Sequence, residues 1–165
     1  MGVDIHMYIC RKGKLSEQIF QGIRNSEWFD NLCQNGDDEY DNLPVRFGIA
    51  PFADKLVQSA GDKDEELNYC PYYGFHFIKV KDFKEWFEKY RPDRKAGWVS
   101  TYDKWRIERK SYIPDCPIIW KDPDAGDDQH FVEFEDPYDM SKHLYDYLKK
   151  HRISNKAYIT YFFDC

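Results

Sequence analysis

The sequence has no long apolar run and none of the common catalytic signatures. No stretch approaches the roughly 18 apolar residues needed to cross a bilayer, and no secretion signal stands near the start. The patterns HExxH, GxSxG, GxxxxGK[ST] and GxGxxG are all missing. These absences leave the zincin, serine hydrolase, P-loop and Rossmann classes without support. We expect a protein of the cytoplasm with no membrane partner.

Paired cysteines are missing as well. The five cysteines are odd in number and form no CxxC or CxxxC pair; they stand at positions 10, 33, 70, 116 and 165. This scatter favours free buried thiols over disulfides or a structural zinc site.

Aromatic residues are abundant. Charged residues make up 33% of the chain, which taken alone favours disorder, but 18% aromatic residues supply enough apolar area for a core. At 165 residues, the length suits one folded domain spanning residues 1–165.

The net charge of −6 is unevenly distributed. Residues 79–110 hold eleven basic and six acidic side chains, a local charge of +5. Acidic residues gather elsewhere, at Asp37, Asp38, Glu39 and Asp41, at Asp62, Asp64, Glu65 and Glu66, and at Asp122, Asp124, Asp127 and Asp128. With acidic residues spread over the rest of the chain, most of the protein's surface would repel nucleic acid. Acid-rich loops are usually only solvated. The alternative is that the first cluster is an acidic interaction surface that would mimic phosphates toward a basic, nucleic-acid-binding host protein.

The basic stretch also contains aromatic residues, namely Trp86, Tyr90, Trp98, Tyr102 and Trp105. Basic and aromatic residues together can describe a nucleic-acid groove with stacking rings. Helical spacing instead assigns most of these rings to the core. We therefore favour a solvated face or an anion-binding patch for a nucleotide-like ligand.

Apolar periodicity predicts alternating strands and helices. The expected strands cover 2–10, 75–80, 118–120, 131–134 and 157–163, and the helices begin at Asn25 or Ser26, at Asp82, at Ser100 and at Asp136. Residues 11–14 read as a hairpin turn. The predicted fold is α+β, with a mixed or antiparallel sheet, both terminal strands central, and two to four helices packed on it.

The opening strand carries unusual polar chemistry on one face. Alternation places Val3, Ile5, Met7 and Ile9 on one side and Asp4, His6, Tyr8 and Cys10 on the other. With His76 from another strand, Asp4 and His6 would form a metal site for zinc or manganese that acidifies a water, with Asp164 nearby. The alternative, which we favour, is a hydrogen bond between Asp4 and His6 in a polar layer.

Several short strings resemble an uncharacterised group of phage and prophage proteins that open with M-G-C-D-I-H. The chain begins MGVDIHMY, with Val3 in place of the cysteine. Arg24-Asn25 before an aromatic helix resembles the group's R-N-Y-x-L-F segment, and the string at 75–77 resembles its D-x-H-S strand, with Phe77 for serine. Residues 158–164, YITYFFD, are similar to its closing V-F-W-F-D.

The resemblance implies a phage-type accessory protein and directs attention to six candidate binding residues: Asp4, His6, Arg24, Asn25, His76 and Asp164. Because no catalytic motif is present, we expect stoichiometric binding without a cofactor, inhibiting or sequestering a component of a bacterial defence system, as anti-CRISPR proteins do. The alternative is a metal-dependent hydrolase of a nucleotide or phosphoester that uses Asp4, His6 and His76.

Overall fold

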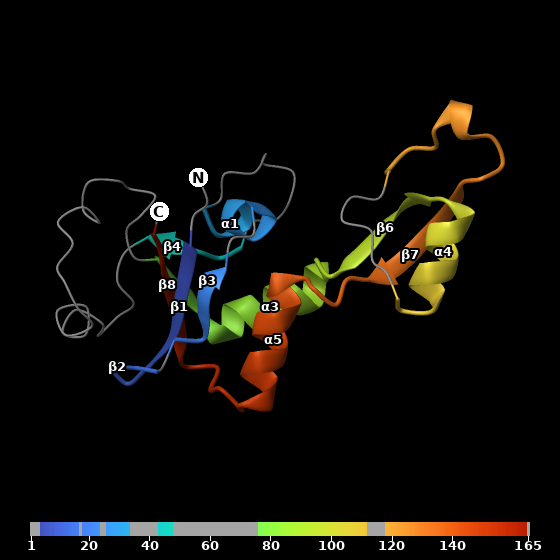
Figure 1. Ribbon diagram of the computed structural model, residues 1–165. Coiled ribbons are helices and arrows are strands. Elements are labelled where there is room, and N and C mark those ends of the chain that lie inside the picture. The colour runs from blue at the N-terminus through green and yellow to red at the C-terminus, as the bar shows by residue number, and fades with distance from the viewer. Residues whose placement is uncertain are drawn as a thin grey trace. The chain divides into compact units, whose positions relative to one another are not determined.

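The two ends of the chain pair with each other at the centre of a sheet. Strands β1 (Asp4–Arg11) and β8 (Tyr158–Asp164) are antiparallel (Figure 1). Strand β8 pairs on its other side with β5 (His76–Lys79). The strand order is β2-β1-β8-β5-β4, where β4 is Arg46–Phe47, and all these pairings are antiparallel. The predicted α+β class with central terminal strands is confirmed.

The structure is a computed structural model that describes residues 4–16, 18–23, 26–33, 43–47, 76–111 and 118–164. The chain divides into two compact units, one formed by Met1–Lys89 with Tyr145–Cys165 and the other by Tyr90–Leu144. One domain over residues 1–165 stays a prediction. None of the described helices is long and apolar enough to cross a membrane.

A tight hairpin turn joins β1 to β2 (Lys14–Leu15). Arg11 pairs with Lys14, so only Lys12 and Gly13 form the loop, with φ angles of 46° and 76°. Positive φ at both central residues is typical of the type I′ turn, whose twist matches that of the flanking strands. The predicted turn at 11–14 is therefore confirmed. A further strand, β3 (Phe20–Ile23), also pairs with β1.

One face of the larger sheet forms the core of the first unit. Its side chains are almost completely buried and come from three strands: Ile5, Met7 and Ile9 of β1, Ile159, Tyr161 and Phe163 of β8, and Ile78 of β5. Helix α1 (Ser26–Cys33) packs on this face, because the rings of Phe29 and Phe163 meet edge to face at 4.8 Å. The hydroxyl of Tyr161 also donates to the backbone carbonyl of Leu32 at 3.0 Å.

Helix α3 (Val80–Tyr90) follows β5 without a linker, as the sequence predicts, but it begins two residues before the expected cap at Asp82. The backbone N–H of Val80 donates to the carbonyl of Ala157 at 3.0 Å. A helix needs partners for its first N–H groups, and a neighbouring backbone here provides one. The aromatic stripe is as predicted, with Phe83 and Phe87 buried.

The second unit is built on the antiparallel pair β6 (Arg94–Val99) and β7 (His130–Glu135). Helix α4 (Thr101–Glu108) follows β6, and the hydroxyl of Ser100 caps it by accepting from the N–H of Asp103, as predicted. The strand expected at 118–120 is reduced to one bridge between Ile118 and Trp98. The predicted strand at 131–134 lies within β7.

Helix α5 (Met140–Lys150) begins later than predicted. Asp139 accepts from the N–H of Lys142 at 2.9 Å, which is the position of an N-cap contact. The expected cap, Asp136, instead accepts from the N–H of Tyr138 and so stabilises a turn before the helix. Both carboxylates suit a cap chemically, and only the tertiary structure selects between them.

Candidate functional site

The polar face of β1 lies in an aromatic setting. His6 is the register partner of Phe162, and the two rings stack with centroids 4.6 Å apart and planes inclined by 6°. The ring of Tyr8 also stacks with that of Phe162, with centroids 6.3 Å apart, and burial raises the pKa of the Tyr8 phenol. The side-chain amide of Gln18 hydrogen-bonds the Nδ1 atom of His6. This packing holds the His6 ring in one orientation.

Asp4 lies at the end of the same row. Its register partner is Asp164, so the prediction that residue 164 lies beside the opening strand is confirmed. Directly opposite positions in an antiparallel pair have Cβ atoms about 5 Å apart. Two acidic positions and one histidine therefore share this end of the β1–β8 pair.

His76 lies on the opposite face of the sheet. Its register partner is Tyr161, its ring stacks on that of Tyr161 at 5.3 Å, and it lies 5.6 Å from the ring of Phe163. Consecutive residues on a strand point to opposite faces. Because His76 pairs with Tyr161 and His6 pairs with Phe162, the two histidines are on different sides.

This register contradicts the expected three-residue metal site. Asp4 and His6 lie on the polar face of β1, whereas His76 is 8% exposed among the core side chains. Strands β1 and β5 are also two strand spacings apart, about 10 Å. In the part of the chain that the structure describes, no three His, Cys, Asp or Glu residues form a group able to hold a metal ion.

Other predicted residues lie outside the described ranges. These are Arg24 and Asn25, and the acidic cluster Asp37, Asp38, Glu39 and Asp41. Of the cysteines, Cys10 is free and buried, as expected. Leu15, Phe77 and Tyr158 pack against it, and burial raises the pKa of its thiol. Such a thiol is a weak nucleophile.

The acidic cluster at 122–128 is described and has a structural role. The carboxylate of Asp128 accepts from the N–H of Thr101 at 3.2 Å, at the N-terminus of α4. Hydrogen bonds from Thr101 lower the pKa of Asp128, as is favourable where a helix presents unpaired N–H groups. The hydroxyl of Thr101 is also 2.7 Å from Nε2 of His130.

The second unit exposes large apolar side chains that sequence patterns did not reveal. Phe131, Trp98 and Ile118 form a row across β7, β6 and the bridged segment, with the rings of Trp98 and Phe131 5.7 Å apart. Ile119 and Trp120 follow Ile118 directly in the chain and are exposed as well. We call the set Trp98, Ile118, Ile119, Trp120 and Phe131 the hairpin patch.

The hairpin patch is strongly exposed, with 74% of Ile119, 71% of Trp120 and 53% of Phe131 accessible to solvent. The sequence feature that could have indicated this exposure is the run of three apolar residues at 118–120. Alternation allows only every second residue of such a run to face one core, so at least one of them had to remain outside.

The aromatic side chains of α4 are exposed, contrary to the prediction that they belong to the core. Tyr102 and Trp105 were assigned to the core, but they are 63% and 46% exposed, and α4 has no buried residue. The two rings stack on each other with centroids 6.0 Å apart. A helix spacing identifies a shared face, and it does not say whether that face is covered.

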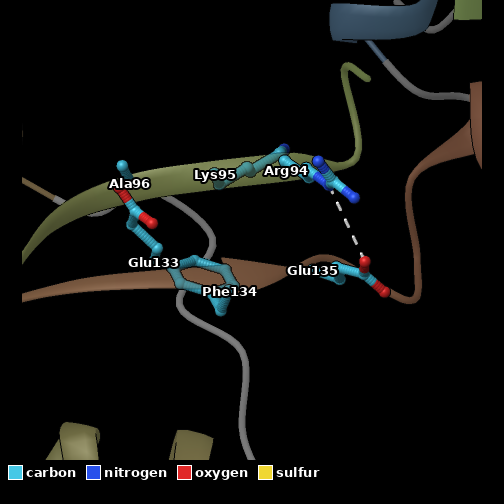
Figure 2. A pocket seen from close by; sticks show the side chains of 6 residues that line it. All are labelled: Arg94, Lys95, Ala96, Glu133, Phe134 and Glu135. Carbon is cyan, nitrogen blue, oxygen red and sulfur yellow. Dashed lines mark ion pairs between the residues drawn. The ribbon is translucent and has the colours of Figure 1, made fainter. Parts of the chain in front are cut away.

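A hollow of about 590 Å³ lies beside the β6–β7 pair (Figure 2). The described residues that line it are Arg94, Lys95, Ala96, Glu133, Phe134 and Glu135. Figure 2 shows Arg94 and Glu135 facing each other from the two strands, and their charged atoms are 3.8 Å apart. Among these described residues, two basic side chains balance two acidic ones, so together they give the hollow no net charge.

Beside this hollow, a buried carboxylate stabilises the second unit. Asp93 is completely buried and receives two hydrogen bonds from the guanidinium of Arg91, at 2.9 and 2.7 Å. Arg91 also reaches Glu135 at 3.2 Å. Burial raises the pKa of Asp93, but the hydrogen bonds and positive charge of Arg91 outweigh it, so the pKa is lowered overall.

Comparisons with protein-family models, with curated proteins and with solved structures give no significant match.

Proposed function

We propose that this protein acts by stoichiometric binding to another protein, through the hairpin patch. The observation that carries the proposal is the exposure of Phe131, which pairs with the half-buried Trp98, and of Ile119 and Trp120, which follow Ile118 in the chain. Adjoining exposed apolar side chains of this size are typical of interaction surfaces. Tryptophan is also among the residues that contribute most binding energy at protein interfaces.

The charged residues next to the hairpin patch indicate the charge of its partner. Lys121 lies over the ring of Trp98, with its Nζ atom 5.7 Å from the ring centroid. The acidic cluster at 122–128 follows directly in the chain and is largely exposed. An apolar centre with a charged rim is the usual anatomy of a transient interface. An acidic rim favours a partner that is basic around its own binding site.

The resemblance to phage and prophage proteins extends this proposal to a target. A phage-type accessory protein would bind a bacterial host protein, and we propose a component of a defence system, of the kind that anti-CRISPR proteins inhibit. A basic, nucleic-acid-binding component would match the acidic rim. The hydrolase alternative finds no support in the register of the sheet, which separates His76 from Asp4 and His6.

The experiment uses purified protein to capture partners from a bacterial lysate, followed by measurement of the purified complex by calorimetry. We expect one-to-one binding that the double variant Ile119→Ser, Trp120→Ser weakens at least tenfold. The matched control is Tyr138→Ser, because Tyr138 is 73% exposed in the same unit but outside the patch. Unchanged affinity in the double variant would overturn the proposal, as would turnover of the partner or of a nucleotide.

The acidic cluster outside the described residues is tested in the same assay. We expect neutralisation of Asp37, Asp38 and Glu39 to slow association and to reduce the dependence of affinity on salt. Binding that responds neither to these substitutions nor to salt would remove phosphate mimicry from the proposal and would leave the hairpin patch as its basis.

A further inference from the structure

One side of α4 combines exposed rings with guanidinium groups. Tyr102, Trp105, Arg106 and Arg109 are spaced i, i+3, i+4 and i+7, so they lie along one face of the helix. The guanidinium of Arg106 lies over the ring of Tyr102 at 5.5 Å, and that of Arg109 lies over Trp105 at 4.2 Å. We call these four residues the α4 ladder.

The ladder is accessible to a partner. Tyr102 is 63% exposed and Trp105 is 46% exposed, and Arg109 is exposed as well. The two rings are nearly parallel, inclined by 18°. The guanidinium groups and the contact between the rings cover part of each ring, and the exposed part is a flat π surface on which another flat, unsaturated group can stack.

Further positive charge lies close to the ladder. Lys104 lies beside the ladder in the helix, and Lys110 follows it directly. Within the described ranges, Lys104, Arg109 and Lys110 take part in no ion pair. Asp128, by contrast, is bound to Thr101 at the opposite end of α4. The C-terminal end of α4, with Arg109 and Lys110, is therefore complementary to an anionic partner.

We propose that the α4 ladder binds single-stranded nucleic acid. Each nucleotide of a single strand supplies a flat base beside a negatively charged phosphate, so stacking on Tyr102 and Trp105 and pairing with Arg109 and Lys110 would occur together. An acidic protein segment would use the cations but give the rings no stacking partner. Bases in a duplex are already stacked and are closed to the rings. This proposal is independent of protein binding through the hairpin patch.

The test is fluorescence anisotropy of a labelled deoxythymidine oligonucleotide of about twelve nucleotides, within the usual range of single-strand site sizes. The full-length protein is titrated at low salt, where phosphate contacts are strongest. We expect saturable binding that Trp105→Ala weakens about tenfold, and that Trp105→Phe largely retains because the ring is preserved. Tyr138→Ala is the matched control, since Tyr138 is an aromatic residue that is 73% exposed and lies outside both the ladder and the hairpin patch.

The role of the cations is measured by the salt dependence. Removing one phosphate contact lowers the slope of log affinity against log salt by about 0.7 for a single strand. We expect this change in Arg109→Ala and no change in Lys81→Ala, a control in which an exposed lysine of α3 is removed. Circular dichroism establishes that each variant is folded.

Several outcomes would overturn the proposal. They are the absence of saturable binding at low salt, equal loss in Trp105→Ala and Tyr138→Ala, and equal affinity for a duplex of the same length. Equally effective competition by a glutamate peptide of matched charge would assign the face to an acidic protein segment instead. None of these results bears on capture of a partner by the hairpin patch, so the two proposals fail separately.

Discussion

His6 and His76 belong to one antiparallel sheet but lie on opposite faces of it, with β8 between their strands. The separation follows from the register. His76 pairs with Tyr161 and His6 pairs with Phe162, and these two consecutive residues of β8 face opposite sides of the sheet. A one-residue shift in either register would have placed both histidines on one side. The register therefore decides between a joint metal site and two separate aromatic contacts.

The separation predicts that the two histidines contribute independently to stability. The free-energy changes of His6→Ala and His76→Ala should add to within about 0.5 kcal/mol in the double variant, because the residues share no contact face. Urea denaturation with and without added zinc measures this. The matched cycle pairs His6→Ala with Phe162→Ala, where the stacked rings should give a coupling of about 1 kcal/mol. Zinc-dependent coupling between the histidines would contradict the register.

Tyr161→Phe tests the link between α1 and the sheet. The lost hydroxyl leaves the carbonyl of Leu32 without this buried donor, so we expect a loss of about 1 to 2 kcal/mol in the free energy of unfolding. Chemical denaturation measures the change. Tyr138→Phe serves as control because Tyr138 is 73% exposed, and its stability should be unchanged. Equal denaturation midpoints for the two variants would show that the Tyr161 hydrogen bond contributes nothing.

The lowered pKa of Asp93 predicts how the stability of the fold depends on pH. Its pKa is lower in the folded protein than in the unfolded chain, so the unfolded chain binds more protons as the pH falls. The stabilising contribution is complete above the ordinary carboxylate pKa of about 4 and is lost as the pH falls through the lower folded pKa. Asp93→Asn should lower stability by roughly 2 kcal/mol at pH 7.

The same variant should also lose less stability on acidification. Thermal unfolding of the original protein and Asp93→Asn between pH 7 and pH 2 measures the difference between the two curves, which isolates Asp93 from the other carboxylates. We expect the curves to converge at the acidic end. Curves that stay parallel over the whole range would show that Asp93 has the same pKa in both states.

The hairpin turn predicts opposite effects at neighbouring positions. Lys12 has a φ of 46°, which asparagine adopts more readily than lysine, so Lys12→Asn should stabilise the fold by about 0.5 kcal/mol. Gly13 has a φ of 76°, and Gly13→Ala should destabilise it by about 1 kcal/mol because a Cβ atom is strained there. Thermal unfolding compares the pair. Effects of the same sign in both variants would contradict the type I′ assignment.

Local signals predicted much of the fold. The alternation of Ile5, Met7 and Ile9 identified the buried face of β1, and the spacing of Phe83 and Phe87 identified the buried stripe of α3. Ser100 marked the start of α4 correctly, because a cap acts on N–H groups within its own first turn. The starts of α3 and α5 were misplaced because the tertiary structure selected other groups at those ends.

The candidate sites depended on more distant relationships. The sequence placed Asp4 and His6 on one strand face and brought Asp164 beside them, since terminal strand pairing follows from two strong strand patterns. Nothing in the sequence specified which residue of β8 stands opposite His76. The exposure of Tyr102 and Trp105 was likewise hidden, because a helical stripe is equally regular when it faces solvent.

By itself, the sequence determined the α+β class, the central position of the terminal strands, the hairpin turn and the faces of individual strands. These follow from interactions within a few residues and from the burial of apolar side chains. Only the tertiary structure decided the register of β5 on β8 and the exposure of the hairpin patch and the α4 ladder. Those features depend on which surfaces meet, and residues far apart in the chain determine that together.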